Sequence, residues 1–228
     1  MRLSQVRRTV ACAGGLVLLA GRAAVGQADD VATSGYGTWT IAPFLGYAQH
    51  SPVGTAWGTT PDRDHFFLGV HLTAPVLRLG PATLSYAPNV VPLVVLTNNP
   101  RYRLVTAPGG QGVFPLEAGR GPVVGAGFSP AGLEVSLRPT KRVELYGAGA
   151  VGGIWFADAV PVRQGRQFNY TFEWGGGVAL GIGGRRAVRV GYKFHHLSNL
   201  YTALANPGVD ANVFYAGLQW TTRHGPRE

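Results

Sequence analysis

The sequence predicts an all-β protein, namely an eight-stranded antiparallel outer-membrane β-barrel. Three observations support this fold class. Segments with alternating hydrophobic and polar residues recur along the chain, and short turns and long loops alternate between them. The composition is also unusual for a soluble domain: the 228 residues include 34 glycines, 11% are aromatic and only 14% are charged, against about 25% charged residues in typical soluble domains.

The first element is an export signal, predicted over residues 1–26. A basic start, "MRLSQVRR", precedes an apolar stretch, and the small residues Ala24 and Gly26 follow at positions suited to cleavage. The apolar stretch ends near Gly21 and is shorter than the ~20 residues that a membrane-spanning helix needs. We therefore expect a signal peptide at 1–26 and a single β-barrel domain at 27–228.

Charge and cysteine content narrow the class of protein further. The net charge of the whole chain is +9, but four arginines lie in residues 1–26, so residues 27–228 keep 16 basic and 11 acidic residues, a charge of +5. This modest charge, without a basic helix or a base-stacking motif, gives no case for nucleic-acid binding. The one cysteine, Cys12, lies in the predicted signal, so packing or a membrane must stabilise the exported domain without disulfides.

Eight segments read as strands, each at least as long as the 9–11 residues of a tilted membrane strand. The clearest begins at residue 167, where Phe168, Tyr170 and Phe172 share one face and Asn169, Thr171 and Glu173 the other. Connections after the second, fourth and sixth segments are short and the others are longer, which is typical of a barrel with both chain ends in the periplasm. The segments are 37–48, 65–77, 82–96, 122–138, 142–157, 167–182, 187–199 and 211–222.

A barrel of eight strands is filled by side chains rather than open, so its inward polar residues must find partners. Buried charges need to be paired, and we expect an interior network of Glu134, Glu144, Tyr146, Glu173, Arg189 and Lys193. Pro75, Pro88 and Pro92 fall within predicted strands, although proline lacks the N–H that a strand donates. We expect bulges or displaced strand ends at these prolines.

The stretch "FHHLSN", residues 194–199, holds the candidate chemistry. Alternation along this strand places His195 inside the barrel and puts His196 and Ser198 on the outer, lipid-facing side. Because the two histidines point in opposite directions, a metal site that uses both is not expected. His196 and Ser198 lean from the same face, and an imidazole can activate a serine hydroxyl as its general base.

The last strand supplies a third polar group beside this pair. Its alternation places Asp210 and Asn212 on the outer face, and it is the antiparallel neighbour of the strand that carries His196. Asp210 can therefore orient the imidazole and stabilise its cationic form, as the acid of a catalytic triad does, with Asn212 as the fallback. The cluster lies at the extracellular end of the barrel.

These residues carry a resemblance to a known family. "FHHLSN", then "NPGVD" and "NVFYAGL", and also "GFSPAGLEV" at 127–135, resemble the PagL-like lipid A 3-O-deacylases, also labelled acyloxyacyl hydrolases. The resemblance implies a serine esterase that removes an ester-linked (hydroxy)acyl chain from lipid A without metal or cofactor. It also implies His196 as general base, Ser198 as nucleophile and Asp210 as the acid, in place of the glutamate found in the family.

An oxyanion that forms during this reaction needs hydrogen-bond donors, and Asn199 and Asn206 are the candidates. The expected partners are the membrane and lipid A or a related outer-leaflet lipid, and a homodimer is left open. The sequence has three rival interpretations. The outward direction of the cluster argues against an acyltransferase that holds a chain inside the barrel, and the aromatic outer faces argue against a soluble lipocalin-like barrel. A non-catalytic barrel, structural or partner-binding, stays open.

Overall fold

The structure is a computed structural model. It describes residues 38–52, 55, 57–97 and 121–222, together with the backbone of residues 103–106 and 113–116. The predicted signal peptide at 1–26 lies outside the described residues. Within the described part of the chain, no helix is long and apolar enough to cross a membrane.

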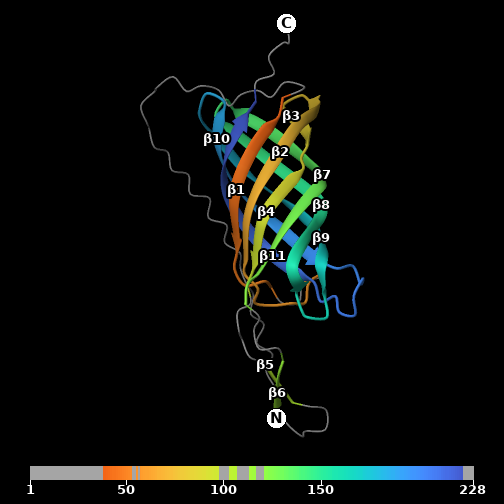
Figure 1. Ribbon diagram of the computed structural model, residues 1–228. Helices are drawn as coiled ribbons and strands as arrows, with labels where there is room; N and C mark the ends of the chain where they lie inside the picture. Colours follow the sequence, from red (N-terminus) through yellow and green to blue (C-terminus); the bar gives the residue numbers. More distant parts are fainter. Residues whose placement is uncertain are drawn as a thin grey trace, which may run out of the picture.

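Antiparallel strands make up the fold, and nine of them form one sheet that closes into a ring (Figure 1). β3 and β4 follow each other between the same neighbours, β2 and β7, so the ring has eight positions. β1 pairs with both β2 and β11, which closes the ring. The strands are β1 (Thr40–Ala48), β2 (His65–Leu79), β3 (Ala82–Tyr86), β4 (Asn89–Leu96), β5 (Arg103–Thr106), β6 (Val113–Leu116), β7 (Val123–Thr140), β8 (Val143–Val160), β9 (Arg166–Gly183), β10 (Arg186–Ser198) and β11 (Val209–Thr221).

The two ends of the barrel differ, as predicted. At one end, here called the turn end, two-residue turns join β2 to β3, β7 to β8 and β9 to β10. Gly80 and Gly184 adopt positive φ angles of 58° and 61° in two of these turns, which glycine tolerates without steric cost. The other end, the loop end, carries the longer connections, including a short hairpin of β5 and β6. The β8–β9 connection is shorter than expected because both strands run on, to Val160 and from Arg166.

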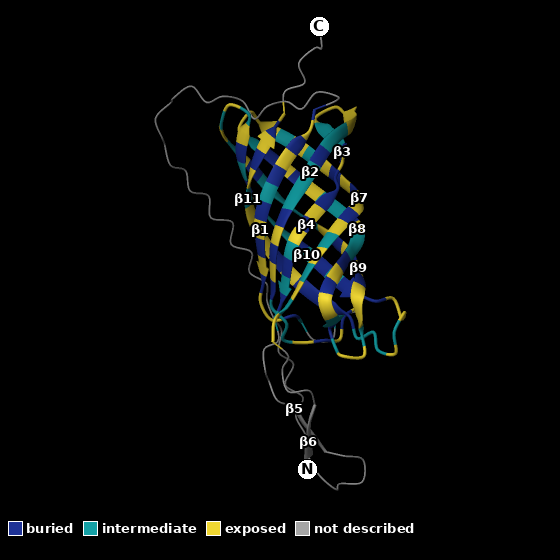
Figure 2. Cartoon of the chain, viewed as in Figure 1, coloured by how far each residue is buried: buried dark blue, intermediate teal, exposed yellow. Residues whose placement is uncertain are grey.

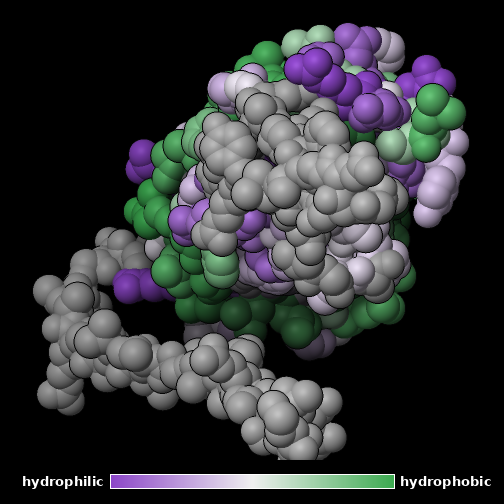
Figure 3. All heavy atoms as spheres, turned by 90° about the horizontal axis from the view of Figure 1, so that it is seen from below, coloured by the Kyte–Doolittle hydropathy of each residue, from purple (hydrophilic) through white to green (hydrophobic). Residues whose placement is uncertain are grey.

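Burial alternates along the wall, and Figure 2 shows the resulting pattern of buried and exposed positions. Large hydrophobic side chains stand exposed on the outer face, among them Leu45, Trp174 and Phe214. Seen from the loop end, hydrophobic residues occupy much of the rim of the ring (Figure 3). An apolar surface this extensive marks contact with a membrane or a partner rather than with water.

Apolar side chains fill the interior toward the loop end. Phe67, Phe156 and Leu197 are fully buried there. The hydrophobic cluster comprises Phe44, Ala48, Phe67, Val91, Val94, Leu96, Ile154, Phe156, Val160, Leu197, Val209, Ala211 and Val213. This packing gives the loop end a solid core behind the wall that carries the candidate site.

The prolines disturb the sheet where they were expected to. The predicted strand 82–96 divides into β3 and β4 at Ala87 and Pro88. The β2–β3 register shifts next to Pro75, and the β4–β7 register shifts around Pro92. The expectation of bulges and displaced strand ends is confirmed, because each missing N–H removes a bond that a regular ladder would contain.

Candidate active site

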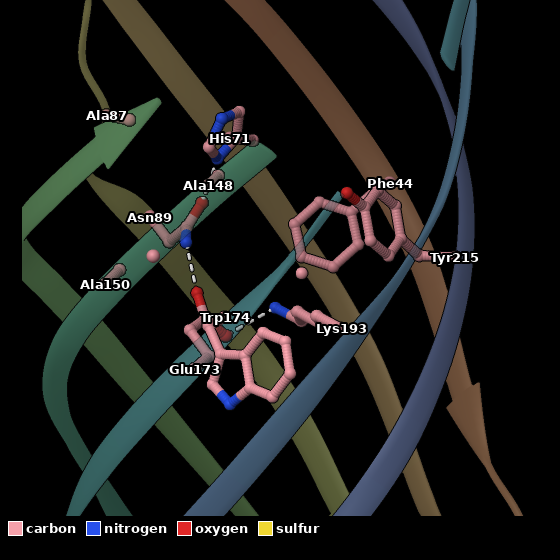
Figure 4. A pocket seen from close by; sticks show the side chains of 12 residues that line it. Phe44, His71, Ala87, Asn89, Ala148, Ala150, Glu173, Trp174, Lys193 and Tyr215 are labelled. Carbon is pink, nitrogen blue, oxygen red and sulfur yellow. Dashed lines mark hydrogen bonds and ion pairs between the residues drawn. The ribbon is translucent and has the colours of Figure 1, made fainter. Parts of the chain in front are cut away.

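Six polar side chains inside the barrel form a continuous chain of hydrogen bonds, here called the interior network. Lys193 Nζ donates to Glu173 Oε2 at 2.6 Å, and Asn89 Nδ2 donates to Glu173 Oε1. Figure 4 shows Asn89 and Lys193 converging on Glu173. The network continues through His71 to Glu134 and on to Arg189, so its members are His71, Asn89, Glu134, Glu173, Arg189 and Lys193.

The interior network confirms that the inward charges are paired. Glu144 has its own partner, since Arg138 Nε lies 2.6 Å from Glu144 Oε2. Tyr146 donates its hydroxyl hydrogen to the Val190 carbonyl at 2.9 Å. The cavity beside Lys193 and Glu173 leaves about 40 Å³ for water, room for only a few molecules. This cavity is too small to hold a fatty acyl chain, and a larger interior cavity of about 160 Å³ nearer the turn end is lined by polar and charged residues, among them Arg138 and Glu144.

The two histidines of "FHHLSN" point to opposite sides of β10, as alternation predicted. His195 is buried inside, with its ring 5.1 Å from that of Phe67. His196 lies on the outer face, where its ring is 6.3 Å from that of Trp57. No group of three or more potential metal ligands occurs among the residues that the structure describes.

His196 and Asp210 are direct cross-strand partners and form a hydrogen bond. They face each other in the β10–β11 register, and His196 Nδ1 lies 2.6 Å from Asp210 Oδ1. Asp210 is fully buried (0% exposed). Asn212, the fallback for this role, is engaged elsewhere, since its Oδ1 accepts a 2.7 Å hydrogen bond from the Tyr192 hydroxyl. Asp210 is thus the group that orients the imidazole.

A segment of the β1–β2 loop covers Asp210. This segment, Thr55 together with residues 57–60, is here called the strap. Thr55 Oγ1 donates to Asp210 Oδ2, and the Gly58 N–H donates to the same oxygen at 3.0 Å. The strap also pairs with the residues just before β11, because Thr59 N donates to the Pro207 carbonyl at 2.7 Å. A buried carboxylate requires such donors, and the strap supplies two of the three.

Trp57 of the strap forms an apolar wall over the imidazole. Its ring lies 5.9 Å from Phe172 and 5.6 Å from Phe194, while 56% of the residue remains exposed. Gly208 makes this close approach possible. It has φ of +62°, and a Cβ there would lie 2.8 Å from the Trp57 carbonyl oxygen and 3.2 Å from His196 Cε1. The glycine of "NPGVD" is therefore required by geometry.

Ser198 ends β10 and is 4% exposed. No hydrogen bond joins Ser198 to His196 within the part of the chain that the structure describes. Such bonds are often long before substrate binds. The distance along the strand is right for one, since residues two apart lie about 6.6 Å apart at the backbone and point to the same side.

The two asparagines proposed as oxyanion donors brace the β10–β11 loop. Asn199 Nδ2 donates to the Ala205 carbonyl at 2.7 Å, and the Asn199 N–H donates to Asn206 Oδ1 at 2.8 Å. Each side-chain amide carries two N–H groups, so these bonds fix the orientation of both amides without using every donor. Their role toward an oxyanion stays a prediction.

The sequence did not reveal Thr55, Trp57 and Gly58. These residues of the β1–β2 loop contact Asp210 and His196 in the candidate site. They lie in a stretch of small residues without periodicity, more than 150 positions before Asp210. The assembled group has an imidazole with one nitrogen held by a buried carboxylate and a serine hydroxyl two positions away. Chemically, this arrangement can generate a serine nucleophile.

Comparison with known proteins bears on this site. A family model described as lipid A 3-O-deacylase (PagL) matches residues 97–219, just over half of the chain, and the match contains His196, Ser198 and Asp210. No curated protein sequence matches the chain.

Among solved structures, the outer membrane enzyme PagL is similar with a TM-score of 0.53 and 11% identity, over 78% of this chain and 97% of that one. Neisserial surface protein A follows with a TM-score of 0.46 and 12% identity, over 81% and 96% of the two chains. Ail of Yersinia pestis has a TM-score of 0.38 and 11% identity, over 82% and 99%. At 11% identity, the likeness to the PagL structure shows a common fold alone.

Proposed function

Because the chain belongs to the lipid A 3-O-deacylase (PagL) family and is an outer-membrane β-barrel, we propose that it is a serine esterase that hydrolyses an ester-linked (hydroxy)acyl chain of lipid A. One observation carries the proposal: His196 is bonded to a fully buried Asp210 on the outer face of the barrel, two positions from Ser198. A barrel that needed only stability has no use for a buried carboxylate at that place.

The chemistry follows the pattern of serine esterases. Ser198 Oγ attacks the ester carbonyl carbon while its proton passes to His196 Nε2, the ring nitrogen opposite the one that Asp210 holds. When the tetrahedral intermediate collapses, the C–O bond to the sugar breaks and the sugar oxygen takes the proton from His196. Water then attacks the acyl-enzyme, again with His196 as base, and a fatty acid leaves.

Asp210 holds the Nδ1–H of the imidazole and stabilises the imidazolium that forms in each step. The amides of Asn199 and Asn206, which lie at the end of β10 and in the following loop, are proposed to donate to the oxyanion. This part of the proposal rests on position alone, since both amides are fixed within reach of the strand end.

The outward direction of the site suits a lipid substrate. Loop ends of such barrels are extracellular, so the site lies at the level of the outer leaflet, where lipid A is found. The acyl chain then stays in the membrane beside the wall, and the filled interior is no obstacle. Catalysis from the lipid-facing side of the barrel is therefore part of the proposal.

Mass spectrometry of lipid A tests the proposal. Cells that express the full chain are expected to lose one ester-linked (hydroxy)acyl group from lipid A, whereas cells that express Ser198→Ala at the same level in the outer membrane are not. If the wild-type chain removes no acyl group, lipid A is not its substrate. If Ser198→Ala removes it as well, the nucleophile is another group.

One observation favours the alternative, a non-catalytic barrel that serves a structural or partner-binding role. Ser198 is almost fully buried, and no hydrogen bond joins it to His196 within the described part of the chain. The same two expression strains separate the alternatives, because a non-catalytic barrel leaves lipid A unchanged in both.

A further inference from the structure

We propose that the turn end of the barrel is a binding surface for anionic phospholipid headgroups of the periplasmic leaflet. The proposal goes beyond the esterase activity and does not depend on it. Six basic residues lie in or beside the three short turns that join β2 to β3, β7 to β8 and β9 to β10. This surface, here called the basic rim, consists of Arg78, Arg138, Lys141, Arg142, Arg185 and Arg186.

Charge is distributed unevenly between the two ends of the barrel. At the turn end, Glu144 is the only acidic residue among those that the structure describes, so the formal charge there is 6 − 1 = +5, and Glu144 is itself bonded to Arg138. At the loop end, outside the candidate active site, three described arginines are balanced by three described aspartates. These residues are Arg63, Arg163, Arg166, Asp62, Asp64 and Asp158. Positive charge therefore gathers at the turn end, which is the periplasmic end of such barrels.

The three turns are neighbours in the ring, so their charges form one surface. Arg78 faces Thr83 across the β2–β3 hairpin, and Thr83 faces Ser136 on β7. The β7–β8 turn is joined to the end of β9, because the Gly181 N–H donates to the Arg142 carbonyl at 2.9 Å. The basic rim thus follows one side of the ring from β2 round to β10 at the upper end of Figure 1.

The basic rim begins where the apolar outer wall ends. Leu79, Leu137 and Ile182 are exposed hydrophobic residues, and each lies within three positions of a residue of the basic rim. Arg186 is the direct cross-strand partner of Trp220, which is also exposed, and such partners point to the same side of a sheet. Aromatic residues of outer-membrane barrels gather where hydrocarbon meets headgroups. The basic rim therefore lies at the level of the periplasmic headgroups.

An anionic phospholipid matches both parts of this surface. Its phosphate diester accepts charge-assisted hydrogen bonds from arginine and lysine, while its acyl chains cover the exposed hydrophobic residues beside the rim. A basic residue near an anionic lipid surface is worth about a fivefold change in affinity. A zwitterionic phospholipid gains less, because its own ammonium group competes for the phosphate. A soluble anion would use the charges and leave the apolar part uncovered.

Two triple variants with the same loss of charge test the proposal. The rim variant is Lys141→Gln/Arg142→Gln/Arg186→Gln, which changes three exposed side chains at the turn end. The control variant at the loop end is Arg63→Gln/Arg163→Gln/Arg166→Gln. Each barrel is purified from outer membranes in a neutral detergent and titrated with phosphatidylglycerol or with phosphatidylcholine of the same chain length. Native mass spectrometry counts the lipid that is bound.

The wild-type barrel is expected to bind phosphatidylglycerol at least about tenfold more tightly than phosphatidylcholine. The rim variant should lose this preference, because three cations at about fivefold each are removed, and the control variant should keep it. Raising the salt concentration should weaken the binding of phosphatidylglycerol to the wild type. Lys141→Gln alone, with an expected loss of about fivefold, repeats the test should the rim variant fail to assemble.

Three results would overturn the basic rim as a lipid site. The first is a wild-type barrel without a preference for phosphatidylglycerol. The second is an equal loss in the rim variant and the control variant, since the net charge of the whole barrel would then explain the binding. The third is tighter binding of soluble peptidoglycan fragments than of phosphatidylglycerol, which would assign the surface to the cell wall.

Discussion

The barrel carries two histidine–carboxylate pairs, one on each side of its wall. His71 lies inside and faces Glu134, with Nε2 and Oε2 3.0 Å apart, while His196 lies outside and faces Asp210 at 2.6 Å. Their side chains are almost equally covered, with 12% and 15% exposed. Burial therefore does not distinguish a structural histidine from a candidate catalytic one in this protein.

Bonding does distinguish them. Both ring nitrogens of His71 are occupied, Nδ1 by Asn89 and Nε2 by Glu134. For His196, the described residues supply a hydrogen bond to Nδ1 alone. A ring with one nitrogen held and the other open can accept a proton and return it, whereas a ring with both held can only brace its neighbours. The open nitrogen of His196 is the feature that separates the two regions.

The largest expected effect comes from replacing each of the two histidines by alanine in turn and measuring activity and stability. His196→Ala should lower ester hydrolysis by roughly 10⁴-fold or more, because the general base is lost. His71→Ala should retain most activity but lower the free energy of unfolding by about 1–3 kcal/mol, because Asn89 and Glu134 lose a buried partner. Ester hydrolysis and urea unfolding in detergent measure the two quantities.

The comparison breaks if the effects are reversed. A His71→Ala variant that is folded but inactive would place the chemistry inside the barrel. His195→Ala supplies a control on the strand itself, since His195 is the inward neighbour of His196 and should affect activity much less than His196→Ala. The opposite order would mean that the faces of β10 are assigned to the wrong sides.

Asp210→Asn should have the next largest effect, a loss of roughly 10³- to 10⁴-fold in kcat. The amide keeps the shape of the carboxylate but removes the charge that stabilises the imidazolium. Steady-state kinetics measure this loss. A variant with wild-type kcat would leave Asp210 as a structural residue.

Thr55→Val should lower kcat about tenfold, the smallest of these effects. The strap keeps the Gly58 N–H on Asp210, so only one of two strap donors is lost. Thr55→Ser restores the hydroxyl and should restore the rate. Thr59→Val is the matched control, because the Thr59 hydroxyl bonds the Pro207 carbonyl and not the carboxylate. Equal losses of kcat in Thr55→Val and Thr59→Val would mean that the strap only holds the loop in place and does not act through Asp210.

The sequence predicted the wall and its two faces because alternation is a local property. It separated His195 from His196 and brought Asp210 beside His196, since an antiparallel hairpin fixes which residues face each other. The prolines also predicted the division of the strand, since a missing N–H removes a hydrogen bond at the position of the proline itself. Alternation along single strands likewise predicted that Glu134, Glu173, Arg189 and Lys193 point inward, but it did not identify His71 and Asn89, which link them.

What the sequence could not predict depends on contacts around the ring. The pairing of Arg189 with Glu134 joins residues on β10 and β7, which are not neighbours in the sheet. Trp57 and Thr55 belong to a loop without periodicity, and only the closed ring brings that loop onto β11.

The strap also determines the step of assembly at which the candidate site becomes complete. His196 and Ser198 are close in sequence, but Asp210 is covered only when the loop after β1 reaches the start of β11. That contact requires the first and last strands of the ring to meet. A chain whose ring has not yet closed would therefore carry an incomplete form of the candidate site, and the proposed activity would report that assembly of the ring is complete.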